Sequence, residues 1–145
     1  MALPTDIELQ VVTPQRHVLQ ETVQSVELPG KDGYLGVLPG HAPLLTELGI
    51  GILSYVKDGQ PRYLTIAHGY AEVLPDRVIV LAEISEKAEE VDVARARESA
   101  EAARARLAQA APGDEVWRHA SVDLERSIVS IQAAARIGAT QDVTH

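Results

Sequence analysis

Histidines are the residues of this sequence best suited to acid–base or metal chemistry, and their spacing decides whether they can act together. The five are His17, His41, His68, His119 and His145, and no two of them form an HxH or HExxH pair. Because the chain has no cysteine, a metal site would require the fold to gather histidines from distant segments. We therefore expect no metal site.

Nucleophiles and phosphate-binding loops give no stronger signal. No serine lies in a GxSxG elbow, and no cysteine is available. The segment Gly30-Lys31-Asp32 is superficially similar to a phosphate loop, but the GxxxxGK[ST] spacing is absent. No spacing selects a pair of carboxylates for glycoside hydrolysis. The sequence thus predicts no catalytic residues and no ATP hydrolysis by this chain alone.

Composition favours protein partners. Thirteen Lys and Arg against 21 Asp and Glu give a net charge of -8, which repels nucleic acid and anionic lipid. With no Phe, one Trp and four Tyr, aromatic platforms for bases are scarce. No apolar run approaches the ~18 residues of a membrane span. The N-terminal segment lacks a basic region and an apolar signal core, so we expect a protein of the cytoplasmic side.

The chain changes composition near residue 86. Seven of the eight prolines and eight of the ten glycines precede this point, whereas 15 of the 20 alanines follow it. In the first part, short apolar segments alternate with period two, as in Ile7, Leu9 and Val11, and turn residues such as Asp58-Gly59 separate them. Several segments are apolar on both faces, which favours two packed layers. We predict an antiparallel β-sandwich over residues 1–86.

Residues 87–145 have helical periodicity. Apolar residues from Val93 to Ala110 recur at spacings of three and four, Asp92 precedes them as an N-cap, and Pro112-Gly113 ends the pattern. A second helix is predicted from about residue 115 to 137 with Asp114 as its cap, so the two form an antiparallel hairpin.

The predicted seam of this hairpin is mostly alanine and should be held weakly. The main stripe of the second helix is Trp117, Ala120, Leu124, Ile128, Ile131, Ala135 and Gly138. A second apolar row consists of Val122, Val129, Ala133 and Ile137, and either the β domain or a partner protein could cover it. Ion pairs along the helices are predicted for Arg97 with Glu101 and for Asp123 with Arg126.

The most distinctive segment is GYLGVLPGHAPLLTELGIG, residues 33–51. Its glycines and prolines are typical of a tight, exposed turn in which the ring of His41 reaches outward. Considered alone, the residues favour a corner of the sandwich where His41 bonds a backbone carbonyl.

This segment resembles the characteristic motif of the epsilon subunit of the F-type ATP synthase. The block from His68 to Val73 and the block from Val91 to Ala96 match the same family in the same order, so the resemblance covers roughly residues 5 to 137. It implies a non-catalytic subunit of the central stalk, peripheral to the cytoplasmic face of a bacterial membrane, that couples proton-driven rotation of the c-ring to the catalytic head.

The resemblance also implies contact residues for the gamma subunit and the c-ring. They are Tyr34, Gly40, His41, Ala42, Pro43, Leu44 and Leu45. Many bacterial members carry an acidic residue where this chain has Tyr34, so packing or a hydroxyl hydrogen bond would have to replace a charge pair.

For the hairpin, the resemblance implies extension along gamma into the catalytic alpha and beta subunits, where it blocks ATP hydrolysis. We expect Arg118, Arg126 and Arg136 to meet acidic segments there. Some members bind regulatory ATP through a block that Asp92 and Arg95 match; here the preferred interpretation is a helix cap with Arg95 as its ion partner. The alternatives are an ATP-sensing module and an unrelated β-sandwich enzyme or binding protein.

Overall fold

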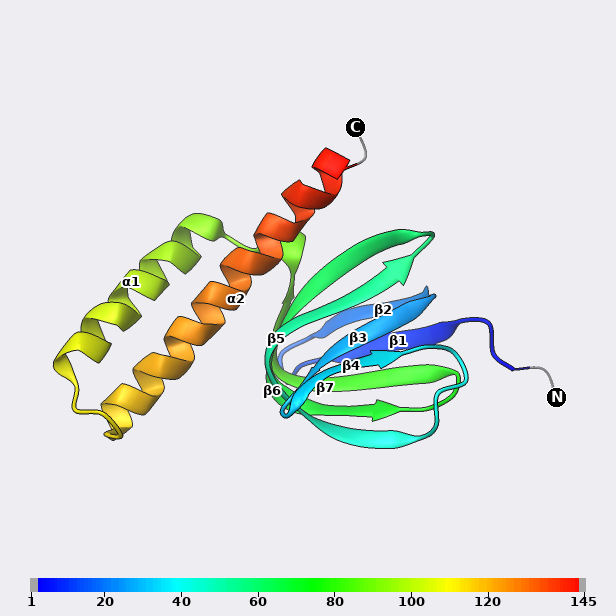
Figure 1. Cartoon of the computed structure of the whole chain (residues 1–145), viewed down its shortest axis with the longest axis horizontal. Coiled ribbons are helices and arrows are strands. Elements are labelled where there is room, and N and C mark those ends of the chain that lie inside the picture. The colour runs from blue at the N-terminus through cyan, green and yellow to red at the C-terminus, as the bar shows by residue number, and fades with distance from the viewer. Residues whose placement is uncertain (1–2, 144–145) are drawn as a thin grey trace. The chain divides into compact units, whose positions relative to one another are not determined.

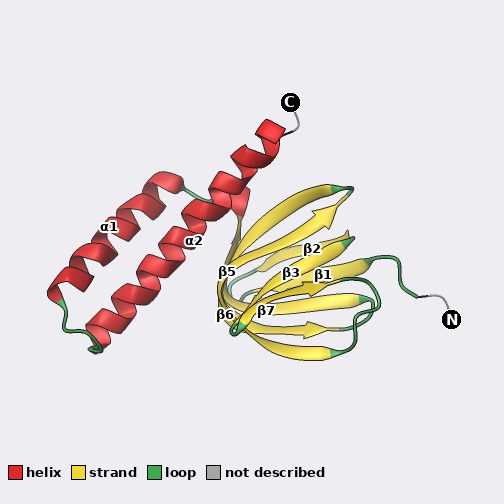
Figure 2. Cartoon of the chain, in the orientation of Figure 1, coloured by secondary structure: helices red, strands yellow, loops and turns green. Residues whose placement is uncertain are grey.

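A computed structural model describes the backbone of residues 3–143 and the side chains of residues 3–138, and it divides into two compact units between Ala88 and Glu89. The first unit contains every strand of the described chain and the second contains both α-helices (Figures 1 and 2). This arrangement confirms the predicted fold class, a β-sandwich followed by a two-helix hairpin.

Seven strands form one hydrogen-bonded sheet in the order β2-β1-β7-β6-β5-β3-β4. Their bounds are β1 Ile7–Val12, β2 His17–Val23, β3 Ser25–Gly30, β4 Gly33–Val37, β5 Leu44–Lys57, β6 Gln60–Val73 and β7 Arg77–Lys87. All neighbours are antiparallel except β1 and β7, which run parallel. The sheet is mainly antiparallel as predicted, and the one parallel pair arises because β1 also pairs with β7, the last strand of the domain.

The sandwich arises because this single sheet curves and folds over its own core (Figure 2). The edge strand β2 contacts β5 and β7 although it is hydrogen-bonded to neither. The predicted alternation is observed, since Ile7, Leu9 and Val11 are fully buried. Two layers therefore enclose an aliphatic core, but both come from one continuous sheet.

The backbone of β6 is irregular at its centre. His68 and Gly69 both have positive φ, 61° and 135°, at the centre of a strand whose neighbours are β5 and β7. A Cβ on Gly69 would overlap the carbonyl oxygen of Leu81 and lie 2.8 Å from the Cα of Ala82. Only glycine allows β7 to approach this closely.

A short 3-10 turn, Ala88–Glu90, spans the boundary between the two units, and the helical unit continues with α1, Val93–Gln109, and α2, Glu115–Val143. Asp92 is the N-cap of α1 as predicted. The carbonyl of Asp114 accepts the first helical hydrogen bond of α2, from the N–H of Arg118 at 2.9 Å. α2 continues beyond the predicted end at residue 137, because the isolated Gly138 costs a helix only about 1 kcal/mol and no proline follows it.

Burial along the hairpin differs in part from the predicted stripes. Ala100 and Ala103 of α1 and Ala120 of α2 are buried as expected for a small-residue seam. In α2, however, Ala135 of the predicted main stripe is exposed, whereas Ala133 of the second row is fully buried. The long helix does not keep one buried face, since a straight helix with 3.6 residues per turn drifts away from a fixed seam.

One of the two predicted ion pairs is wrong. Glu101 pairs with Arg104 at 2.8 Å and not with Arg97, because i,i+3 spacing brings Arg104 to the same carboxylate. Asp123 lies 3.8 Å from Arg126 as predicted, and it also receives a 2.7 Å hydrogen bond from Arg106 of α1.

Candidate docking surfaces

The turn of residues 38–43 connects β4 to β5 and is tied to the rest of the β domain by its backbone. Gly40 has φ 87° and donates its N–H to the carbonyl of Pro75, in the loop between β6 and β7, at 2.8 Å. The N–H of His41 donates to the carbonyl of Leu38 at 3.1 Å. These bonds hold the turn in a defined position, so its exposed side chains are presented on a rigid support.

His41 makes the local contact that its sequence neighbours suggested. Its Nδ1 lies 2.6 Å from the carbonyl oxygen of Ala42. Because a carbonyl oxygen only accepts, Nδ1 must carry the hydrogen, and Nε2 of the neutral ring is then an acceptor. The carbonyl bond fixes the ring and leaves Nε2 to meet a donor from outside the described chain.

Leucines around this turn are unusually exposed for their size. Leu38, Leu44 and Leu45 have exposed fractions of 66, 40 and 70%. Ala42 and Pro43 between them are also exposed. Large apolar side chains grouped in this way are typical of a surface that another protein covers.

The exposed leucines continue onto the outer surface of β5, β6 and β7. Strand register places Leu45 opposite Glu72 and Glu72 opposite Ile79, while Tyr70 lies opposite Leu81. Directly opposite residues share one face of a sheet, as do residues two apart along a strand. Tyr70 is 54% exposed and Leu81 57%. We call Leu45, Tyr70, Ile79 and Leu81 the apolar face, and the exposed carboxylates of Glu47 and Glu72 lie beside them on the same face.

Sequence reasoning did not select Tyr70, Ile79 or Leu81 as site residues. The available signal was that β7 is apolar at every position from Val78 to Ala82, whereas a strand with one wet face alternates. The pattern predicts a strand covered on both faces by two packed layers. In the structure, however, the face of β7 that carries Leu81 is open to solvent.

Tyr34 occupies a different part of the domain from the turn. Its hydroxyl accepts a hydrogen bond from the N–H of Ile52 at 3.1 Å, eight positions along β5 from Leu44 (52 − 44 = 8). Near Ile52 the pairing of β3 with β5 is shifted, because Glu27 pairs with Ser54 whereas Gly30 pairs with Leu48. The hydroxyl therefore satisfies a strand N–H beside the irregularity, and the ring stays 57% exposed.

Asp92 and Arg95 are adjacent at the start of α1, but their contact is that of a cap. The Asp92 carboxylate accepts from the backbone N–H of Arg95 at 3.1 Å. The expected ion pair with the Arg95 guanidinium is replaced by this backbone bond, because the N-cap geometry directs the carboxylate at the free N–H groups of the first turn.

The three arginines of α2 are distributed along the helix. Arg118 and Arg136 are separated by 136 − 118 = 18 residues, which is five full turns, so they lie on the same side about 27 Å apart. Both are exposed. Arg126 lies about 80° around the helix from them and is half-buried near Asp123.

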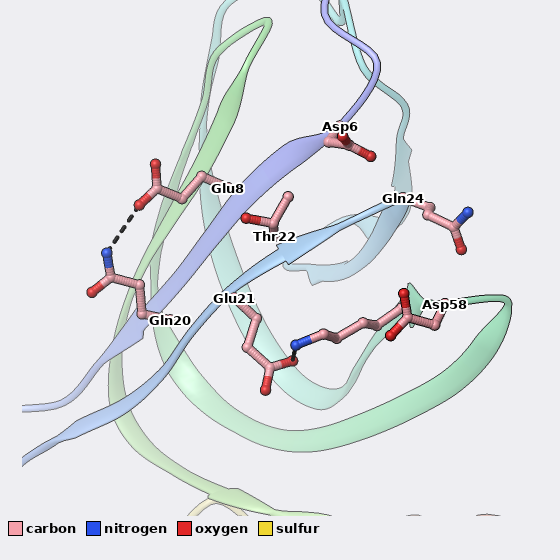
Figure 3. A pocket seen from close by; sticks show the side chains of 8 residues that line it. Asp6, Glu8, Gln20, Glu21, Thr22, Gln24 and Asp58 are labelled. Atoms are coloured by element: carbon pink, nitrogen blue, oxygen red, sulfur yellow. Dashed lines mark hydrogen bonds and ion pairs between the residues drawn. The ribbon is translucent and has the colours of Figure 1, made fainter.

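The β domain also has a hollow lined by polar side chains (Figure 3). It is lined by Asp6, Glu8, Gln20, Glu21, Thr22, Gln24, Lys57 and Asp58. Two pairs of its side chains interact: Gln20 donates to Glu8 at 2.9 Å, and Lys57 lies 3.5 Å from Glu21 (Figure 3). Four carboxylates against one ammonium make it a solvated acidic surface that disfavours anionic ligands.

The remaining histidines lie in separate places. His17 contacts Gln10 at 2.9 Å, and His119 lies 3.9 Å from Glu115; His145 is outside the described residues. Within the described part of the chain, no three His, Asp or Glu side chains are grouped to hold a metal ion. Neither described helix combines the length and the apolar character needed to cross a bilayer.

The fold defines a two-part protein, in which a β domain with exposed apolar side chains is followed by a helical hairpin. A family profile for the beta-sandwich domain of the ATP synthase delta/epsilon chain matches residues 6–88. The chain belongs to this family.

Relatives named ATP synthase epsilon chain support the assignment. The one from Koribacter versatilis is 51% identical over 105 residues, covering 72% of this chain and 74% of its own. Epsilon chain 2 of Syntrophotalea carbinolica is 43% identical over 132 residues, covering 91% of this chain and 96% of its own.

Solved structures are similar as well. A chain in the Euglena gracilis mitochondrial ATP synthase, solved as OSCP/F1/c-ring, has a TM-score of 0.79 at 26% identity, covering 93% of this chain and 84% of that one. A chain from the Tetrahymena thermophila central stalk and c-ring shares the fold, with a TM-score of 0.55 at 12% identity, covering 92% of this chain and 99% of that one.

Proposed function

We propose that this chain is the non-catalytic epsilon subunit of the central stalk of a proton-driven F-type ATP synthase. It couples rotation of the c-ring to the catalytic head and inhibits ATP hydrolysis through its hairpin. The observation that carries the proposal is the exposed apolar surface formed by the turn and the apolar face, in a chain aligned over most of its length with ATP synthase epsilon chains.

In this proposal the β domain is the stalk contact. The apolar face packs against the gamma subunit, because Tyr70 and Leu81 offer aromatic and aliphatic area on the adjacent strands β6 and β7. The turn meets the c-ring, where Nε2 of His41 accepts a hydrogen bond and Leu44 and Leu45 are covered. The chain is then peripheral, at the cytoplasmic face of the bacterial membrane, and is held there by protein contacts.

Tyr34 takes the place of the acid found in many bacterial members. Because its hydroxyl already accepts from Ile52, the hydroxyl hydrogen remains for a partner acceptor, and the exposed ring adds packing area. This contact is neutral, so its contribution to binding the c-ring should depend little on salt.

The hairpin supplies the inhibitory contact with the catalytic alpha and beta subunits. Arg118 and Arg136 lie on one side of α2 and suit carboxylates on a partner, since guanidinium groups bind carboxylates through paired hydrogen bonds. Arg126 is available to the same partner only if its approach to Asp123 is given up.

The test measures ATP hydrolysis by a catalytic complex depleted of epsilon, with the full chain or its variants added back. Wild-type chain should suppress hydrolysis. The double variant Arg118→Glu with Arg136→Glu should bind the complex normally through its β domain and inhibit far less.

Arg97→Glu on α1 is the matched charge-reversal control and should inhibit like wild type. If the double variant binds and inhibits as strongly as the wild type, the inhibitory role of these arginines is refuted. If no variant binds, the proposed stalk contact itself is refuted.

A further inference from the structure

The buried side chains of the hairpin are mostly small, so an ion pair that joins its two helices can contribute to holding them together. The buried residues of α1 are Ala100 and Ala103, and those of α2 are Ala120, Ser127, Val129 and Ala133. The Ser127 hydroxyl donates to the carbonyl of Asp123 in its own helix at 2.9 Å and thus does not link the helices. Alanine contacts allow close approach but stabilise it little, because each buries little apolar area.

Arg106 and Asp123 connect the helices near the loop. Nη2 of Arg106 donates to Oδ2 of Asp123 at 2.7 Å, within the range of a charge-assisted hydrogen bond. Arg106 lies in the last turn of α1, where a cation also interacts favourably with the helix dipole. The other Asp123 oxygen faces Arg126 at 3.8 Å, so one carboxylate lies between two guanidinium groups.

The loop between the helices does little to fix their closure. α1 ends with Ala110 in an extended conformation, and the turn that follows is closed by one bond from the Asp114 N–H to the Ala111 carbonyl at 3.1 Å. Gly113, with φ 85°, makes this segment easy to rearrange. A restraint on the helix pair must therefore come from side chains beyond the loop.

We propose that Arg106 and Asp123 form an electrostatic latch that keeps α1 and α2 closed as a hairpin. The pair is half-exposed, with side-chain exposures of 46 and 41%, so solvent screens it and its effect is moderate. The inference goes beyond the proposed inhibition, because it concerns closure of the hairpin within the isolated chain. When the latch opens, each helix loses its neighbour, and most of the stability of a helix in a protein comes from the packing of its apolar face.

Hydrogen exchange of the full-length chain tests the latch through the helix that does not carry the substitution. Arg106→Gln changes α1 but should raise exchange of the α2 amides around residues 119–130 by about twofold to fivefold, as expected for an exposed ion pair. Arg104→Gln is the matched control. It removes the Arg104–Glu101 pair within α1 and should leave α2 exchange unchanged.

A double-mutant cycle separates the latch from local helix effects. Asp123→Asn should also raise exchange in α1, and adding Arg106→Gln to Asp123→Asn should produce no further increase in either helix. The proposal is overturned if Arg106→Gln leaves α2 exchange at the wild-type rate, if Arg104→Gln raises it equally, or if the two latch substitutions act additively.

Discussion

Replacing Gly69 with alanine should destabilise the β domain far more than a glycine substitution in a strand usually does. The added Cβ would overlap the Leu81 carbonyl oxygen on β7, and the Ala82 Cα is 2.8 Å away. Both atoms are backbone and cannot rotate aside, so β6 and β7 must separate locally. The residue would also have to keep a φ of 135°, a region that alanine rarely enters.

The magnitude follows from these two effects. A strained backbone conformation of this kind costs about 1–3 kcal/mol. Loss of one or two ladder hydrogen bonds between β6 and β7 adds about 1 kcal/mol each. The expected loss is therefore about 2–5 kcal/mol, a large part of the roughly 5–15 kcal/mol that stabilises a typical domain.

Gly36→Ala provides the matched control, because its Cβ meets nothing within 4 Å and its φ is not in the left-handed region. Both substitutions reduce the entropy of the unfolded chain equally, an effect that stabilises by about 0.4–1 kcal/mol. Urea unfolding followed by circular dichroism, with hydrogen exchange of β7 as a local probe, should give Gly36→Ala at or slightly above wild-type stability. If Gly69→Ala came within about 1 kcal/mol of this control, the proposed close approach of β6 and β7 would be refuted.

Three further substitutions test the separate surfaces. Tyr34→Phe removes the acceptor of the Ile52 N–H and should lower the unfolding free energy by about 1–2 kcal/mol in denaturant titrations; an unchanged midpoint would exclude this role for the hydroxyl. Leu81→Ser should leave unfolding within about 0.5 kcal/mol of wild type, because the side chain is exposed, but should weaken binding to the gamma subunit about tenfold in surface plasmon resonance. Equal binding by Leu81→Ser and wild type would remove the apolar face from the interface. Asp92→Ala should destabilise the start of α1 by about 1 kcal/mol, seen as faster amide exchange at residues 94–96, and Asp92→Asn should restore most of the protection; failure of that rescue would argue for a role other than capping.

The contrast between the two units has a consequence for function. The β domain has a core of branched aliphatic side chains, whereas α1 buries only alanines. A tightly packed core resists deformation, and small-residue contacts are more easily exchanged. The same chain thus combines a rigid docking surface with a helical element suited to rearrangement, as the proposed division between coupling and inhibition requires.

Much of this protein was determined by local features of its sequence. Alternation of apolar residues predicted the strands, the three-and-four spacing predicted both helices, and Asp92 and Pro112-Gly113 marked where α1 begins and where its pattern must stop. The motif around His41 also indicated an exposed turn, and the ring bonds a carbonyl as its neighbours suggested. These features depend on contacts within a few residues, so a single sequence expresses them directly.

The tertiary structure decided everything that depends on pairing between distant segments. Tyr70 and Leu81 lie on one exposed face only because β6 and β7 pair in this register, and a shift of one residue would turn one of the two side chains to the other face. The parallel pairing of β1 with β7, the bond from Ile52 to Tyr34 and the contact between Arg106 and Asp123 likewise join residues far apart in the chain. Periodicity identifies the faces of an element but not its neighbours, because strand order and helix register are chosen by the packing of the whole domain.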